Sequence, residues 1–267
     1  MALRLSAALR NAVLKGRSLK FEMGNCFLKL YTGSQPATAE AAPTGTLLCT
    51  YSVSSGAITR ETLAVGSLTL STCTSGTIDT IKLTPPGPGT AIDILGGAVT
   101  ADGTDAGTAT LCATAINDNP ANVWVRASTT GASGVITLTA VPGLGATINT
   151  WAVTGTETGA PAIGTLVDMT GGVTAVSGLK WSAADAGVLS KKTTQTWSGV
   201  AAATGTAGWF RIEAAVTDSG ALDSGEVYKR IDGAVATSGA ELNLSSLSIA
   251  NTATQTIDTF TLTLPTA

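Results

Sequence analysis

The residues best placed for chemistry are three carboxylates in one Gly- and Ser-containing segment, Asp218, Asp223 and Glu226. Most glycosidases use a pair of carboxylates, one as general acid and the other as base or nucleophile. Such a pair needs firm positioning, which a loop of this composition does not provide. The segment therefore predicts a flexible loop, with a hydrolase site as the less favoured alternative.

Other chemical motifs are weaker. The chain has no His, so it lacks the usual general base and every His-based triad. The run from Asp102 to Asp105 has some features of a calcium loop but lacks the bidentate acid, so a polar turn is expected. Ser190 beside Lys191 and Lys192 could form a Ser–Lys dyad, yet a solvated pair is favoured. We therefore predict that the protein is not an enzyme and needs no metal or cofactor.

The four cysteines, Cys26, Cys49, Cys73 and Cys112, are far apart and form no CxxC motif. That spacing argues against zinc binding. Buried free thiols are the favoured expectation. A bridge between Cys26 and Cys49, on neighbouring predicted strands, is the alternative.

Five tryptophans, Trp124, Trp151, Trp181, Trp197 and Trp209, could provide a surface for stacking sugars. Tryptophan in a strand more often packs in the core, which is the expectation adopted.

Charge is scarce and unevenly distributed. Only 12% of the 267 residues are charged and the net charge is −3. Without the basic residues that precede the first acidic one, 10 basic residues remain against 18 acidic ones. The five that precede it are Arg4, Arg10, Lys15, Arg17 and Lys20. These five are the candidate assembly residues, on an arm that either docks on a neighbouring subunit or presents a solvated helix face. The weak self-repulsion of such a chain suits assembly with copies of itself.

Two classes of partner are not expected. The basic residues have no aromatics between them and the pI is about 4.9, which argues against nucleic acid. No apolar run approaches the roughly 18 residues of a membrane helix, and the N-terminus lacks the apolar core of a secretory signal.

The element that organises the chain is an alternating segment at Trp209–Val216. Phe210 and Ile212 fall on one face, and Trp209, Arg211 and Glu213 fall on the other, which predicts a half-buried strand. The small residues of 205–208 before it should let another backbone pass close by.

The remaining elements are predicted from apolar spacing and from the turn residues between segments. Apolar spacing predicts a helix over 2–15, within an N-terminal arm of residues 1–20, and an interior helix over 106–117. Strands are expected at 27–31, 46–53, 67–71, 77–83, 92–94, 123–127, 135–140, 150–154, 227–231 and 256–264. Strands this closely spaced favour a sandwich or jelly roll. The expected protein is mainly β, with a β-sandwich or jelly-roll-like host domain (21–62 and 161–267) and an inserted α+β module (63–160).

Three segments together resemble a family of virion structural proteins of tailed bacteriophages: Leu28–Leu48, Thr204–Arg211 and Arg230–Pro265. The module, with Asp93–Gly96 and Ala113–Asn117, is similar to one that recurs in phage structural proteins. The resemblance implies a head, neck or tail accessory protein located in the virion, whose partners are copies of itself and other virion proteins. It implies no catalytic residues. The alternative is a receptor- or glycan-binding module of a tail fibre, with a host-surface glycan as partner.

Overall fold

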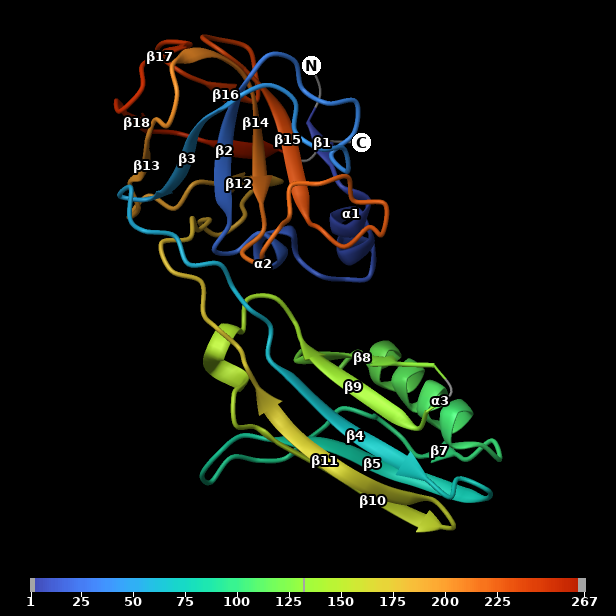
Figure 1. Cartoon of the computed structure of the whole chain (residues 1–267). Coiled ribbons are helices and arrows are strands. Elements are labelled where there is room, and N and C mark those ends of the chain that lie inside the picture. The colour runs from blue at the N-terminus through green and yellow to red at the C-terminus, as the bar shows by residue number, and fades with distance from the viewer. Residues whose placement is uncertain (1–2, 132, 264–267) are drawn as a thin grey trace. The chain divides into compact units, whose positions relative to one another are not determined.

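A computed structural model describes residues 3–131 and 133–263 (Figure 1). The protein is mainly β, with 42% of its residues in strands and 12% in helices. The strands form several antiparallel sheets, and the helices include a short one at the N-terminus and an inserted one, α3 (Asp105–Asp118). This confirms the predicted fold class. The chain forms two compact units: residues up to Glu61 together with those from Ala175 onward, and Thr62–Thr174.

The first unit contains β1 (Arg4–Leu5), α1 (Ala7–Leu14), α2 (Leu19–Glu22), β2 (Phe27–Thr32), β3 (Leu47–Val53), β12 (Val188–Ser190), β13 (Trp197–Val200), β14 (Gly205–Glu213), β15 (Arg230–Ala236), β16 (Leu242–Asn243), β17 (Ser248–Ile249), β18 (Thr254–Ile257) and β19 (Thr261–Thr263). Nine of these strands form one sheet in the order β1-β15-β14-β2-β3-β13-β18, with β16 joined to β15 and β17 to β14. β12 and β19 form a separate two-stranded sheet.

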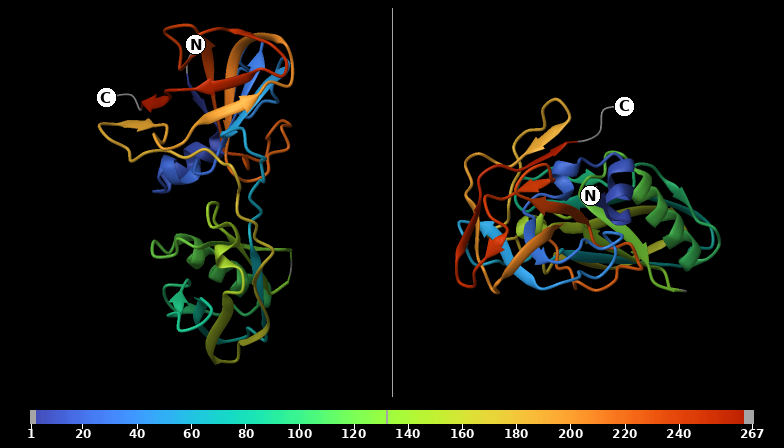
Figure 2. Two further views of the ribbon diagram at one scale, coloured as in Figure 1. Left: turned by 90° about the vertical axis from the view of Figure 1, so that its left-hand side faces the viewer. Right: turned by 90° about the horizontal axis from the view of Figure 1, so that it is seen from above.

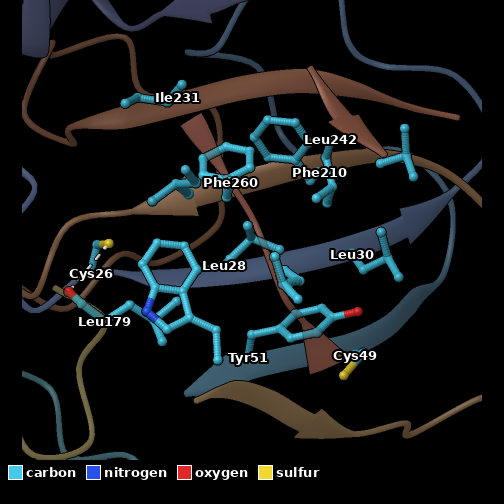
Figure 3. Close-up of a cluster of buried hydrophobic side chains, with 14 of the residues drawn as sticks. Cys26, Leu28, Leu30, Cys49, Tyr51, Leu179, Phe210, Ile231, Leu242 and Phe260 are labelled. Carbon is cyan, nitrogen blue, oxygen red and sulfur yellow. Dashed lines mark hydrogen bonds between the residues drawn. The ribbon is translucent and has the colours of Figure 1, made fainter. Parts of the chain in front are cut away.

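The core of this unit lies on one side of the large sheet, and the small sheet contributes Leu189 and Leu262 to it. Figure 3 shows Phe260 next to Phe210, and their ring centroids lie 5.4 Å apart. The expected single strand over 256–264 is wrong. It is split into β18 and β19, because residues 258–260 carry the chain from one sheet to the other while Phe260 fills the core.

The predicted helix over 2–15 is wrong at its start. Arg4 and Leu5 instead form β1, an edge strand antiparallel to β15. Ser6 then caps α1, its Oγ accepting a hydrogen bond from the Leu9 amide at 3.4 Å. A serine at this position satisfies one of the free amides of the first helical turn, so it fixes where the helix begins.

β14 has the predicted alternation but not the predicted exposure. Phe210 and Ile212 face the core. Trp209, Arg211 and Glu213, which alternate with them, are also buried, at 0%, 0% and 1% exposure. The expectation of a half-buried strand is therefore wrong.

The close approach expected at residues 205–208 is confirmed. A Cβ on Gly208 would lie 2.0 Å from the Gly33 carbonyl oxygen, well inside contact distance. The next strand pairs antiparallel with β14, but it covers Arg230–Ala236 instead of the predicted 227–231.

The second unit contains β4 (Val65–Ser71), β5 (Gly76–Thr84), β6 (Ile92–Asp93), β7 (Val99–Thr100), α3 (Asp105–Asp118), β8 (Val125–Thr129), β9 (Val135–Ala140), the 3-10 turn Gly145–Ile148, β10 (Ala152–Gly159) and β11 (Ala162–Thr170). One sheet has the order β11-β4-β9-β8; the other has β10-β5-β6, with β7 also on β5. α3 packs into the core between them through Ala109, Cys112 and Ile116, and Figure 2 shows the unit from two further sides.

The module extends beyond the predicted boundary at residue 160. β11, which was not predicted, pairs antiparallel with β4, with Val167 opposite Ser67. Because this pairing belongs to the second unit, the unit ends at Thr174. Only residues 160 and 161 lie between β10 and β11.

Candidate assembly site

The N-terminal segment is held on the edge of the large sheet by Ser6. Its amide donates to the Arg230 carbonyl at 3.0 Å, and its Oγ donates to the Tyr228 carbonyl at 2.8 Å. The same Oγ accepts from the Arg230 amide at 3.0 Å. Leu9, fully buried, adds an apolar anchor. The segment is therefore part of the first unit and not a free arm.

Two of the five predicted assembly residues are bound within the unit. Arg4 donates to the carbonyl of Pro36. Arg17 forms an ion pair with Glu22, which is almost fully buried and also pairs with Lys229. These contacts fix local structure, so neither Arg4 nor Arg17 offers a free charge to a partner.

The other three predicted residues lie at the surface. The Arg10 side chain is 62% exposed and reaches Glu40 only at 3.9 Å. Lys15 and Lys20 are exposed. Arg10, Lys15 and Lys20 are thus exposed on and beside α1 and α2. Arg4 and Arg17 instead make contacts within the unit.

Behind this segment, the face of β14 and β15 opposite the core carries an ionic layer of buried and half-buried side chains: Lys29, Arg60, Arg211, Glu213, Asp218, Arg230 and Asp232. At its centre, Arg211 Nε and Nη2 donate to the two carboxylate oxygens of Asp232, each at 2.7 Å. The two residues face each other across the strands and both are 0% exposed. Burial raises the pKa of Asp232 even though Arg211 opposes the shift.

The guanidinium of Arg211 has a further contact and one free group. Its central carbon lies 5.4 Å from the ring centroid of Trp209, which is stacked on Tyr31 at 4.6 Å. Within residues 3–131 and 133–263, its Nη1 has no hydrogen-bond partner. The pair is therefore packed tightly against aromatic rings and shielded from water.

A second bidentate pair joins Arg230 to Asp218. The Arg230 Nε and Nη2 donate to Asp218 at 2.6 and 2.5 Å. Arg230 also donates to the carbonyls of Glu40 and Ala221 at 3.0 Å. Burial works against the charge of Asp218, but the hydrogen bonds from Arg230 and the Gly220 amide outweigh it and lower its pKa.

The remaining two loop carboxylates also hold structure. Asp223 accepts from the amides of Val227 and Tyr228 at 2.9 and 2.7 Å. Glu226 Oε2 accepts from Asn11 Nδ2 of α1 at 3.1 Å. The Asp218 side chain and Asp223 are buried. These carboxylates tie segment 217–229 to the sheet and to α1.

Glu213 completes the layer and has two cationic partners. Glu213 binds Lys29 Nζ at 2.7 Å and Arg60 Nη2 at 2.6 Å. The sequence places Arg211 and Glu213 on one strand face but does not predict the ionic layer. The signal that could have predicted it is Trp209 on the same face, because a large aromatic side chain favours a surface that is covered.

Outside this layer, α1, α2 and segment 217–229 expose an unusual set of apolar side chains. Val13 is 37% exposed, Leu14 84%, Phe21 42%, Leu222 65% and Val227 69%. The bonds Asn11–Glu226, Arg17–Glu22 and Lys229–Glu22 hold these segments together. We call these five residues with Arg10, Lys15 and Lys20 the basic patch. Exposed apolar groups on the same segments as exposed cations suit an acidic protein surface that also carries apolar groups.

The tryptophans form no sugar-stacking surface. Trp151, Trp181, Trp197 and Trp209 are buried, at 7%, 4%, 0% and 0% exposure, as the core interpretation predicts. Trp124 is half-buried against Trp151, with ring centroids 5.0 Å apart.

The other candidate residues are structural too. All four cysteines are free and buried, which confirms the favoured expectation over a Cys26–Cys49 bridge. The run from Asp102 to Asp105 forms the N-terminal cap of α3, where Thr104 Oγ1 accepts from the Gly107 amide at 3.0 Å. Lys191 Nζ donates to the Gln195 carbonyl at 2.7 Å.

The described part of the chain lacks two further features. Within it, no group of three or more His, Cys, Asp or Glu side chains is arranged to hold a metal ion. No helix among those residues has the length and apolar character needed to cross a membrane.

One shallow hollow of about 370 Å³ lies in the second unit, between residues 95–99 and the C-terminal end of α3. Asp118 is the only carboxylate among the described residues that line it. A Cβ on Gly96, whose φ is +78°, would lie 2.8 Å from the Asn119 side chain, so the loop needs glycine there. A single exposed carboxylate does not provide the acid–base pair of a glycosidase.

Comparison of the chain with protein families, with curated proteins and with solved structures finds no match.

Proposed function

We propose that the chain is a non-enzymatic structural subunit of a tailed-bacteriophage virion, acting as a capsid decoration, collar or neck, or tail accessory protein through subunit contacts. The observation that carries the proposal is the basic patch, because exposed apolar groups and exposed cations lie on the same hydrogen-bonded segments. The loop carboxylates, which were the best catalytic candidates, serve that bracing. The resemblance to phage virion proteins gives the particle context.

The test is incorporation into particles. A tagged chain is supplied during particle assembly, particles are purified on a density gradient, and the chain is detected by peptide mass spectrometry. The matched variant, Arg10→Glu with Lys15→Glu and Lys20→Glu, changes only exposed side chains. Deleting residues 1–20 would be a poorer test because it removes the buried Leu9. Absence of the wild-type chain from the particles would refute the proposal. Incorporation of the variant at the wild-type level would show that the basic patch is not needed for assembly.

The alternative, a receptor- or glycan-binding module, finds its one specific support in the hollow beside α3. Binding there would depend on Asp118, the exposed carboxylate that lines it. A glycan array probed with wild type and with Asp118→Ala separates the two functions. Binding that Asp118→Ala abolishes would favour this alternative.

A further inference from the structure

The hollow beside α3 carries charge of one sign. Asp118, which lines it, stands in the last turn of the helix, and that turn contains no basic residue. The carbonyls at the end of a helix have a partial negative charge, so an acid there adds to that charge instead of balancing it. Neither Lys82 nor Arg126, the two basic residues of the second unit, is among the described residues that line the hollow. The hollow is therefore negative.

The second unit as a whole has the same sign of charge. Residues 62–174 contain seven acidic and two basic residues, which gives a net charge of −5. The rest of the chain has 13 basic and 11 acidic residues, a net charge of +2. The field around the second unit therefore attracts cations toward the hollow and repels anions from it.

Side-chain amides fix the shape of the hollow. Asn119 Nδ2 donates to the Ile94 carbonyl at 3.1 Å, which ties the end of α3 to the segment after β6. Asn122 Nδ2 donates to the carbonyls of Ile116 and Val125 at 2.9 and 3.0 Å, which ties the same helix end to β8. β7 packs against the helix (Figure 1). The hollow is therefore preformed, and a ligand does not have to order it.

Apolar side chains make up much of the remaining lining. Leu95, Val99 and Ala115 are among the residues that line the hollow. Residues 111, 115 and 118 follow the spacing of a single helix face, and Leu111 on that face is 45% exposed. An aliphatic chain therefore has an apolar surface to lie on when its charged end is at Asp118.

The size of the hollow limits what it holds. Its volume of about 370 Å³ is near the lower end of the range for ligand pockets, about 300–1,000 Å³. That space suits one side chain better than an oligosaccharide. No aromatic side chain is among the described lining residues, so a sugar ring has nothing to stack on there.

We propose that the hollow binds a primary alkylammonium group, and that its natural ligand is a lysine side chain of another protein. The ammonium donates to the Asp118 carboxylate at the negative end of α3, and its methylene chain lies against Val99 and Ala115. Lysine commonly buries this chain on apolar surface while its charge stays near water, which suits a shallow hollow. The site lies in the second unit, and its chemistry does not depend on the proposed virion function.

The experiment titrates n-butylammonium into the full-length, isotope-labelled protein at constant ionic strength. NMR shifts of the amides of Gly96, Gly97 and Asn119 report on the hollow. Asp118→Asn keeps the shape of the side chain and removes its charge. The matched control is Glu157→Gln, which removes an exposed carboxylate of the same unit that does not line the hollow. The neutral probe 1-butanol tests the need for the ammonium, and thermal unfolding checks that each variant is folded.

Butylammonium should cause saturable shifts at these three amides, and 1-butanol should bind more weakly. Asp118→Asn should lower the affinity about fivefold, which is the upper end for an exposed ion pair, and Glu157→Gln should leave it unchanged. Ala115→Leu should abolish binding because the larger side chain fills the hollow. Absence of saturable shifts in the wild type, equal affinity in Asp118→Asn, or equal binding of 1-butanol would overturn the proposal, as would undiminished binding in Ala115→Leu.

A second titration identifies the source of the ammonium. Nα-acetyl-lysine methylamide and glucosamine both carry one, but only the lysine derivative has an aliphatic chain. Tighter binding of the lysine derivative would support a protein partner. Glucosamine binding at least as tightly would overturn that choice and favour the glycan-binding alternative. Particle incorporation is read separately: a chain that enters particles without binding either probe refutes only this site, and one that binds lysine without entering particles refutes only the virion function.

Discussion

The buried pair of Arg211 and Asp232 offers the sharpest test of the ionic layer. Asp232→Asn keeps the size of the side chain but removes its charge, which leaves Arg211 as an uncompensated cation among aromatic rings. Both side chains are 0% exposed and share two hydrogen bonds of 2.7 Å. Breaking such a pair by removing one partner typically costs about 3–5 kcal/mol. At about 1.4 kcal/mol per factor of ten, the opening equilibrium of the unit should rise by more than a hundredfold.

Hydrogen exchange read by mass spectrometry suits a chain of two units, because peptides from β14 and β15 report on the first unit alone. Exchange in these peptides should accelerate in Asp232→Asn and not in peptides of residues 62–174. The exposed pair of Arg10 and Glu40 provides the control, since Arg10→Met should cost less than about 1 kcal/mol. Replacing both partners, Arg211→Met with Asp232→Leu, should recover most of the loss.

A loss below about 1 kcal/mol in Asp232→Asn would contradict the description of the layer as dry, because only a water-filled layer could screen the remaining charge. Failure of the double variant to recover would instead show that the pair's hydrogen bonds orient the loops above it, a role that apolar side chains cannot replace.

Four further outcomes are expected. Ser6→Ala should lower stability by about 1–2 kcal/mol in thermal unfolding, because it removes the cap of α1 and a buried link to Tyr228; a change in melting temperature no larger than that of Ser34→Ala, an exposed site, would contradict it. Gly208→Ala should destabilise the first unit, because its Cβ would lie 2.0 Å from the Gly33 carbonyl oxygen, and unchanged exchange in β14 would refute the close approach. Burial raises the pKa of Cys26 and Cys112 to about 12, so native protein at pH 8 should resist alkylation until denaturant is added. Because its folded pKa is lowered, Asp218 contributes stability above the ordinary Asp value of about 3.9 and loses it as the pH falls through the folded value; exchange in segment 217–229 should rise on acidification, and Asp218→Asn should flatten that dependence.

Local patterns predicted the elements whose side chains repeat regularly. β9 has the predicted bounds, Val135–Ala140, and α3 differs from the prediction by one residue at each end. β1 has only two residues, too few for any pattern to show. β11 lacks a simple alternation because two bulges change which side chains face outward. These elements are defined by pairing with distant strands, which local sequence does not encode.

The cover over the ionic layer was equally unpredictable. An alternating strand indicates that its two faces differ, but not what lies over the polar one. Arg230 is held partly by the backbone carbonyls of Ala39, Glu40 and Ala41, and every residue type has a carbonyl. For the same reason, five basic residues could be named as a group from the sequence, but their division into two bound and three exposed depended on the fold.

The layer also explains why the first unit has a basic surface although the chain as a whole is acidic. The layer acids Glu213, Asp218 and Asp232 are buried and each is paired with one or two cations, and Glu22 of α2 is buried and paired as well. Burying those carboxylates leaves few acids to neutralise Arg10, Lys15 and Lys20 outside. The second unit has no such layer among its described ion pairs, and Glu157 and Asp168 remain exposed. The basic character of the patch thus arises from where the acids of the first unit are used. A variant that removes the buried carboxylates should therefore weaken the basic patch by loosening its support, even with every surface charge intact.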